Sequence, residues 1–224
     1  MKKKIFGDLV FTSCAAGLDW PSKSAKKYTR QRVLNHDEIR DIWHAASSLG
    51  YPGGDFIKLL LLTGARRNEV ARMTWSEINF DKREWNLPGA RAKNKADFVV
   101  PLSDMAVDLL ESIERRGPFV FAHTGGPISD FSRIKSRVVA LLPAEIADWR
   151  FHDLRRSAAT EWNRLRIDLE VRRALLNHAK ARLDGTYDRH DLLDEKRAAL
   201  TAWAHKLDEI VNGSVATNVV PLRN

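Results

Sequence analysis

Basic, imidazole and phenol side chains occur in several short polar stretches of this sequence, and together they could supply the parts of one reaction. Breaking a phosphodiester bond without a metal ion requires a nucleophile, cations that stabilise charge on the phosphate oxygens, and an acid for the departing oxygen. Arginine suits the cation, histidine and lysine suit proton transfer, and tyrosine offers a hydroxyl group. The candidates are Arg66, Lys93, His152, Arg155, His178 and Tyr187.

Arg66 follows the pair Thr63-Gly64, where one helix is expected to end and another to begin. The start of a helix leaves backbone amides free for an anion, which an arginine there could also face. His152 and Arg155 are three residues apart in a stretch expected to open a helix, so they would share one face. Taken singly, Arg66 is equally well explained as an exposed arginine, and the other two as a capping histidine with a surface arginine.

The remaining candidates are also weak when each is considered alone. Lys93 lies in a polar stretch before an apolar strand, where a hairpin tip would let its ammonium reach a groove, but most hairpin lysines are solvated. His178 follows Leu175-Leu176-Asn177 at an expected helix end, which favours a histidine through the helix dipole alone. Tyr187 follows Asp184-Gly185-Thr186, and partial core packing would explain a tyrosine there.

Two helices and a hairpin are expected to position the first of these residues. Asn35 with Glu38 three residues later is typical of an N-cap that opens an amphipathic helix. Apolar residues then recur at helical spacing from Phe56 until Gly64, a plausible C-cap, and a second helix should carry Glu69. Residues 78–80 and 84–87 predict a short hairpin, with 98–102 as a third strand.

After Ser103 the apolar spacing predicts almost only helices. They are expected around residues 105–113, 134–141, 154 onward, 171–176 and 200–211. The last of these carries Trp203 on its apolar side, and it could pack on the chain's own core or on a neighbouring protomer. The expected fold is α+β and mostly helical, with one small three-stranded antiparallel sheet.

Composition favours a polyanionic partner. The 224 residues include 37 Lys and Arg against 29 Asp and Glu, for a formal charge of +8 and a pI near 9.7. Cys14 is the only cysteine, so an internal disulfide and a cysteine-rich zinc site are excluded, and a reducing, cytoplasmic location is expected. No apolar run approaches the roughly 18 residues of a membrane span, so a soluble protein without membrane association is expected.

The composition changes along the chain and predicts three parts. Residues 1–32 are expected to form a basic linker or arm, residues 33–212 one globular domain, and residues 213–224 a tail without helical periodicity. The basic cluster of the arm could neutralise phosphates, although such a cluster is usually just a solvated segment. Its members are Lys23, Lys26, Lys27, Arg30 and Arg32.

The order of the candidate residues carries more information than any one of them. The segment Thr63-Gly64-Ala65-Arg66-Arg67-Asn68-Glu69-Val70 comes first, and Lys93 then precedes Phe98-Val99-Val100-Pro101-Leu102. His152-Asp153-Leu154-Arg155 and Leu176-Asn177-His178 follow, and Tyr187 comes last. In type, order and spacing this series resembles the motifs of the tyrosine recombinases of the phage integrase type. The resemblance extends from about residue 32 to residue 211, which makes residues 33–212 the expected catalytic domain.

The resemblance implies a mechanism and a set of roles. Tyr187 would attack a DNA phosphate to give a 3′-phosphotyrosyl link, with Arg66, Arg155 and His178 on the phosphate oxygens. His152 would assist proton movement, Lys93 would protonate the leaving 5′-oxygen, and Glu69 would support Arg66. No metal or cofactor is needed. The implied partners are double-stranded DNA and further copies of the chain, as a tetramer. The expected DNA-binding residues are the basic cluster of the arm together with Arg67, Lys95 and Arg156.

Two departures from the family pattern keep alternatives open. The family often has glycine where Asn177 stands, a mild change because asparagine also tolerates the left-handed conformation. The family normally places a DNA-gripping helical domain before the catalytic one, and residues 1–31 are too few to form it. A non-catalytic DNA-binding remnant is therefore one alternative. A metal-dependent phosphohydrolase is another, with His152, Asp153, Asp184, Asp188, His190 and Asp191 as its possible ligands.

Overall fold

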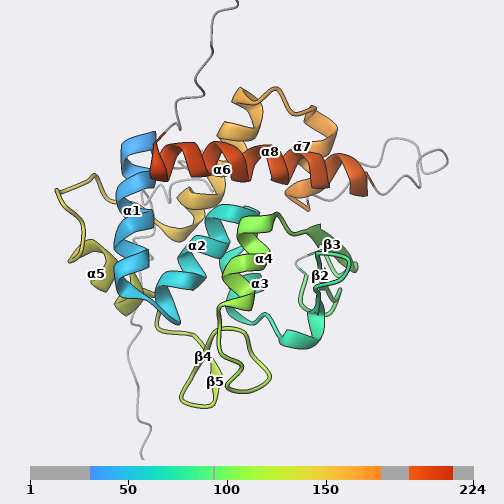
Figure 1. Ribbon diagram of the computed structural model, residues 1–224, viewed down its shortest axis with the longest axis horizontal. Helices are drawn as coiled ribbons and strands as arrows, with labels where there is room; N and C mark the ends of the chain where they lie inside the picture. Colours follow the sequence, from blue (N-terminus) through green and yellow to red (C-terminus); the bar gives the residue numbers. More distant parts are fainter. Residues whose placement is uncertain (1–30, 93, 178–191, 214–224) are drawn as a thin grey trace, which may run out of the picture. The chain divides into compact units, whose positions relative to one another are not determined.

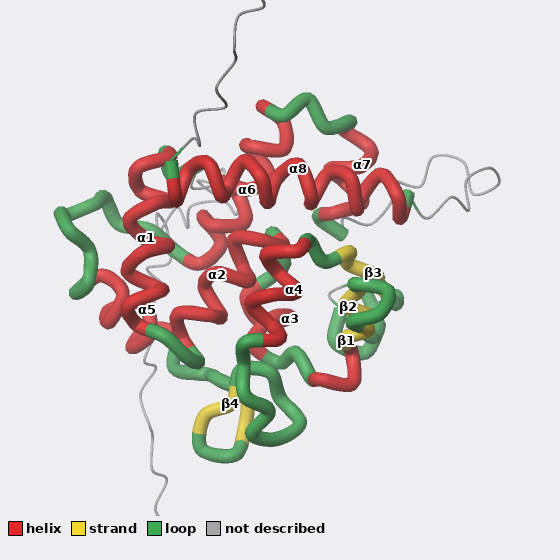
Figure 2. The backbone as a smooth tube through the Cα atoms, in the orientation of Figure 1, coloured by secondary structure: helices red, strands yellow, loops and turns green. Residues whose placement is uncertain are grey.

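The computed structural model describes residues 31–92, 94–177 and 192–213 (Figure 1). By its backbone contacts the chain divides into two units, Met1–Gln31 and Arg32–Asn224, and the helices and strands below belong to the second. Most of the described residues are helical, and a three-stranded antiparallel sheet accompanies the helices (Figure 2). The predicted fold class is therefore confirmed.

The first helix begins, and the second helix ends, where the sequence indicates. Helix α1 (His36–Leu49) has the predicted capping box, in which the Asn35 side chain accepts from Glu38 N at 2.8 Å and the Glu38 carboxylate accepts from Asn35 N at 2.9 Å. Helix α2 (Gly53–Thr63) is buried nearly all round. It approaches α1 so closely that a Cβ at Gly54 would lie 1.9 Å from the Ala46 carbonyl oxygen.

The predicted three-stranded sheet is present, with slightly shorter strands. Helix α3 (Arg67–Ala71) and a 3₁₀ turn (Trp75–Glu77) lead into β1 (Ile78–Asn79), β2 (Glu84–Leu87) and β3 (Phe98–Pro101). The strands lie in the order β1-β2-β3, and Trp85 on β2 pairs with Val100 on β3. The loop between β2 and β3 is closed at its base, where Gly89 N donates to the Asp97 carboxylate at 2.7 Å. This loop contains the predicted Lys93.

The second half of the chain is less purely helical than predicted. Its helices are α4 (Asp104–Glu111), α5 (Phe131–Val139), α6 (Phe151–Arg164), α7 (Leu169–Leu175) and α8 (Leu193–Asn212). Between α4 and α5 lies a small hairpin that was not predicted, formed by β4 (Ala122–His123) and β5 (Gly126–Pro127). Its turn residues Thr124 and Gly125 have φ angles of 50° and 82°, and such a turn was recognisable from the His-Thr-Gly-Gly sequence.

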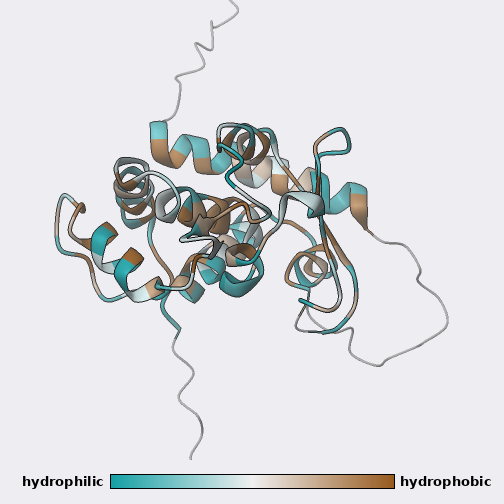
Figure 3. Cartoon of the chain, turned by 90° about the horizontal axis from the view of Figure 1, so that it is seen from below, coloured by the Kyte–Doolittle hydropathy of each residue, from teal (hydrophilic) through white to brown (hydrophobic). Residues whose placement is uncertain are grey.

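Helix α8 packs on the chain's own core rather than being left free for a neighbour. It contacts α1, α2, α4, α6, α7 and β3 (Figure 1). Hydrophilic and hydrophobic residues both recur along its length (Figure 3). Trp203 is fully buried, and its indole N–H donates to the Leu61 carbonyl of α2 at 2.8 Å. At the end of α8, Arg40 Nε donates to the Ile210 carbonyl at 2.8 Å, and the His44 ring contacts the Val211 carbonyl at 2.9 Å.

Aromatic rings that are buried or partly buried connect α2 with the starts of α5 and α6. Phe56 of α2 lies 5.8 Å from Phe131 and 5.7 Å from Phe151, measured between ring centroids, and Phe131 and Phe151 are 5.9 Å apart. Such pairs stabilise a core beyond the area they bury. In the described part of the chain, no helix combines the length and the apolar character needed to cross a membrane.

Candidate active site

Arg66 stands at the junction between α2 and α3, as predicted. Helix α2 ends at Gly64, whose φ of 59° and ψ of 17° are left-handed, and α3 begins directly after Arg66. The Glu69 carboxylate accepts from the Arg66 backbone N at 3.1 Å and from Arg66 Nη1 at 2.9 Å. Glu69 is buried, so this carboxylate holds both the start of α3 and the direction of the guanidinium. This contact is the one through which Glu69 would support Arg66, and that role stays a prediction.

The Gly64 turn also brings α6 to the site. A Cβ at Gly64 would lie 2.7 Å from Cη2 of Trp162, so only glycine permits both the turn and this approach of α6. Arg155 lies about two turns before Trp162 on α6, and it donates from Nη1 to the Gly64 carbonyl at 2.6 Å. The segments Thr63–Val70 and His152–Arg155, far apart in sequence, are therefore joined by a direct contact.

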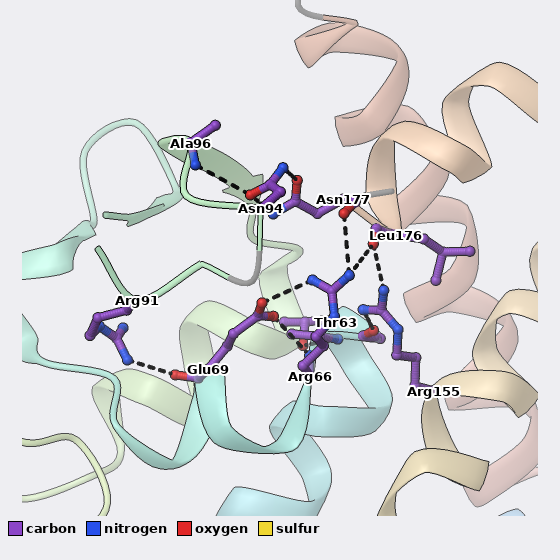
Figure 4. Close-up of polar contacts among 11 residues, drawn as sticks. Thr63, Arg66, Glu69, Arg91, Asn94, Ala96, Arg155, Leu176 and Asn177 are labelled. Atoms are coloured by element: carbon purple, nitrogen blue, oxygen red, sulfur yellow. Dashed lines mark hydrogen bonds and ion pairs between the residues drawn. The ribbon is translucent and has the colours of Figure 1, made fainter. Parts of the chain in front are cut away.

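Both arginine side chains converge on the end of α7 (Figure 4). The Leu176 carbonyl accepts from Arg155 Nη2 at 2.5 Å and from Arg66 Nη2 at 3.4 Å, and the Asn177 carbonyl accepts from Arg66 Nη2 at 3.2 Å. We use the name arginine pocket for this cluster of hydrogen-bonded groups, which consists of Arg66, Arg155 and the two carbonyl groups. Three stretches of the predicted motif series thus meet at one place.

The arginine pocket carries excess positive charge in a partly desolvated setting. Arg155 is only 5% exposed. Its burial and the nearby positive charge of Arg66 lower the pKa of Arg155 to about 10, and Glu69 acts in the opposite direction. Arg155 is therefore still protonated at neutral pH. The Glu69 carboxylate pairs with Arg66 and acts on Arg155 only through its charge, so an anion such as a phosphate would relieve the repulsion between the two guanidinium groups. The alternative of Arg155 as a surface arginine is wrong.

His152 occupies the first turn of α6 and is exposed, in contrast to Arg155. The cap of this helix is made by Asp153, whose carboxylate accepts from Arg150 N at 2.9 Å and from Arg156 Nη1 at 2.8 Å. The alternative of a capping histidine is therefore wrong as well. Partial desolvation, then the positive charges of Arg156 and Arg155, lower the pKa of His152 below its usual range, and Asp153 acts against them. This shift favours the neutral imidazole, the form that accepts a proton.

We expect the His152 imidazole to titrate at lower pH in the folded protein than in a peptide of the same local sequence. The fold favours the neutral ring, so its contribution to stability is present above the unfolded pKa and is lost as the pH falls through the folded pKa. NMR titration of the His152 ring measures this directly. Arg156→Ala should raise the value, because Arg156 is the largest of the charges that lower it. A folded pKa equal to or above that of the peptide would contradict the electrostatic account.

The predicted DNA-binding residues have mixed environments where the structure describes them. Arg32 pairs with Glu38, and Arg156 pairs with Asp153. Arg67 follows Arg66 in the sequence, and its guanidinium lies 4.2 Å from the centroid of the Phe131 ring. Lys95 is exposed, with a φ of 58°. The other predicted site residues lie outside the described residues, namely Lys23, Lys26, Lys27, Arg30, Lys93, His178 and Tyr187.

A buried polar network behind the pocket was not predicted. Arg91 of the β2–β3 loop donates from Nε to the Glu77 carboxylate at 2.9 Å and from Nη1 to the Glu69 carbonyl at 3.2 Å. Glu77 is buried and also accepts from the Trp85 indole N–H at 2.9 Å. The network ties the loop to α3. Because an arginine in a polar loop is usually solvated, nothing in the sequence distinguished Arg91 from its basic neighbours.

The metal-dependent alternative rests mainly on residues outside the described ranges. Asp184, Asp188, His190 and Asp191 belong to them, and Asp153 is engaged in capping α6. In residues 31–92, 94–177 and 192–213, no three or more His, Cys, Asp or Glu side chains gather in a group that could hold a metal ion.

Comparisons with known proteins give a consistent set of relatives. The model of the phage integrase family matches residues 32–192. Prophage integrase IntA of Escherichia coli strain K12 is 33% identical over 162 residues, which cover 69% of this chain and 38% of that protein. Prophage integrase IntF of the same strain is 25% identical over 186 residues, covering 78% and 38%. The chain thus spans about two fifths of the length of these relatives.

Solved structures share the fold at lower sequence identity. A lambda integrase tetramer bound to a Holliday junction superposes with a TM-score of 0.58 at 22% identity, covering 75% of this chain and 52% of that one. The XerH site-specific recombinase bound to its difH substrate gives 0.56 at 18% identity, covering 75% and 54%. Because the family model spans most of the sequence, and because one prophage integrase exceeds 30% identity over more than two thirds of it, this chain belongs to the phage integrase family of tyrosine recombinases.

Proposed function

We propose that this protein cuts and rejoins DNA strands in site-specific recombination, through a covalent bond between Tyr187 and a DNA phosphate. The observation that carries the proposal is the convergence of Arg66 and Arg155 on the Leu176 carbonyl. A pair of guanidinium groups fixed in this way can bind the non-bridging oxygens of a phosphate without reorganising as negative charge develops. Family membership supports the same reaction.

The proposed reaction balances without a metal or an external energy source. The Tyr187 oxygen bonds to phosphorus as the bond from phosphorus to the 5′-oxygen breaks, and attack by another 5′-hydroxyl reverses the step. His152, whose surroundings favour the neutral imidazole, would help to take the Tyr187 proton, and Lys93 would give a proton to the leaving oxygen. His178 would join the arginines on the phosphate. The energy of the broken ester is kept in the phosphotyrosine.

The proposed partners are double-stranded DNA and further copies of this chain. The charge of +8 suits a polyanion, and the lambda integrase relative was solved as a tetramer on a DNA junction. Residues 33–212 would form the catalytic domain, residues 1–32 a basic linker, and residues 213–224 a tail.

Tyr187→Phe is expected to abolish the covalent adduct and to leave DNA affinity within about twofold, because only the nucleophilic oxygen is removed. A nicked suicide substrate, from which the 5′-hydroxyl fragment diffuses away, traps the adduct for gel analysis and mass spectrometry. Tyr51→Phe is the matched control, since the Tyr51 hydroxyl is engaged with the Ala122 backbone N at 3.0 Å. An adduct that survives Tyr187→Phe refutes the nucleophile assignment.

A second candidate is a DNA-binding protein that does not cleave. The net charge of +8 suits DNA binding whether or not the chain cleaves. The same suicide substrate separates the two candidates, because the second predicts a bound complex of the unaltered chain without any covalent adduct. Adduct formation in the presence of EDTA would in turn exclude a metal-dependent phosphohydrolase.

A further inference from the structure

Asn177, which stands where the family often has glycine, contacts the β2–β3 loop through its side chain. Its Oδ1 accepts from Asn94 Nδ2 at 2.5 Å, and its own Nδ2 donates to Asn94 Oδ1 at 3.5 Å. Asn177 is 8% exposed and adopts a left-handed φ of 43°. The two amides therefore face each other across 83 residues of sequence, as Figure 4 shows.

The backbone of Asn177 belongs to the arginine pocket at the same time. Its N donates to the Ala174 carbonyl at 2.8 Å, which ends α7, and its carbonyl accepts from Arg66 Nη2 at 3.2 Å. Asn177 thus contacts Arg66 through its backbone carbonyl and Asn94 of the loop through its side chain. A glycine would allow the same turn but would offer the loop no hydrogen bond.

Asn94 connects the Asn177 side chain to the rest of the β2–β3 loop. It lies between the Arg91 network, which fixes one side of the loop to α3, and the Gly89–Asp97 contact, which closes the base of the loop. Its Oδ1 also accepts from Ala96 N at 3.4 Å. The amide pair joins this loop to the end of α7.

We propose that Asn94 and Asn177 are positioning residues, whose paired amides set the distance between the β2–β3 loop and the arginine pocket during strand cleavage. This inference rests on the proposed function, in which the loop supplies Lys93 as the acid. The pair is uncharged, so it orients the loop without changing the positive charge that binds phosphate. Misplacing a reacting group by about 1 Å can cost on the order of 10²-fold in rate.

Single-turnover cleavage by Asn94→Ala, Asn177→Gly and the double variant tests the proposal. Asn177→Gly keeps the turn and removes only the amide, and Asn94→Ala changes an exposed residue, so both variants should fold. Each single variant should cleave about 10- to 100-fold more slowly, and the double variant should be no slower than either one. Asn86→Ala, an exposed asparagine on β2, is the matched control and should keep the original rate.

A substrate with sulfur in place of the 5′-bridging oxygen distinguishes positioning from a general structural defect. A thiolate leaves without a proton, because a thiol has a pKa near 8.5. The variants should therefore cleave the sulfur substrate within a few-fold of the unaltered chain. Equal losses on both substrates would overturn the proposal, as would a defect in Asn177→Gly with none in Asn94→Ala. Absence of any adduct with the unaltered chain on both substrates would instead refute the proposed function.

Discussion

Arg66→Ala is expected to slow formation of the covalent DNA adduct by about 10³-fold, a typical contribution of an arginine to phosphoryl transfer. The Arg66 and Arg155 guanidinium groups both donate to the Leu176 carbonyl. In this position Arg66 can stabilise the charge that develops on a phosphate in the transition state. DNA affinity should change by less than about tenfold, because most affinity comes from the wider basic surface. Rapid-quench cleavage and equilibrium binding at one salt concentration measure the two effects.

Arg72→Ala is the matched control for this prediction. It removes the same charge from an exposed arginine at the end of α3, which is not part of the arginine pocket. Removal of Arg66 also takes away a side-chain donor from the buried Glu69 carboxylate. The double variant Arg66→Ala, Glu69→Gln therefore tests for a loss of folding, and it should be as slow as the single variant. Equal losses in binding and cleavage for Arg66→Ala would argue against a transition-state role.

Trp203→Ala is expected to lower the free energy of unfolding by about 3–5 kcal/mol, the usual cost of removing a large buried aromatic side chain. Trp203 is fully buried, and its indole N–H donates to the Leu61 carbonyl of α2, so the change leaves both a cavity and an unmatched acceptor. Chemical denaturation followed by far-ultraviolet circular dichroism measures the loss. Thr201→Ala, at an exposed position of the same helix, should change the value by less than about 0.5 kcal/mol.

The packing of α8 on its own chain can also be tested by the dependence of unfolding on protein concentration. If the helix packs in cis, the midpoint of unfolding should not depend on protein concentration. A midpoint that rises with concentration for the unaltered chain, and no longer does so for Trp203→Ala, would show that the helix packs on a neighbouring protomer in solution.

Local signals were sufficient to predict much of the fold. The capping box of Asn35 and Glu38, the left-handed Gly64 and the strands 84–87 and 98–101 all depend on residues close together in sequence. Interactions of this kind, between side chains and nearby backbone, can be recognised from spacing. The hairpin of β4 and β5 was missed because two-residue strands have no measurable alternation, and only their turn residues indicate them.

The sequence by itself determined which residue types could act on a phosphate and where Arg66 and Glu69 sit, since both are set by one helix junction. The tertiary structure alone decided that Arg155 is buried, that it shares the Leu176 carbonyl with Arg66, and that Asn94 faces Asn177. These contacts join residues 21 to 110 positions apart. Periodicity reports which face of an element is buried, whereas the packing of α6 and α7 against the Gly64 turn determines which side chains meet there.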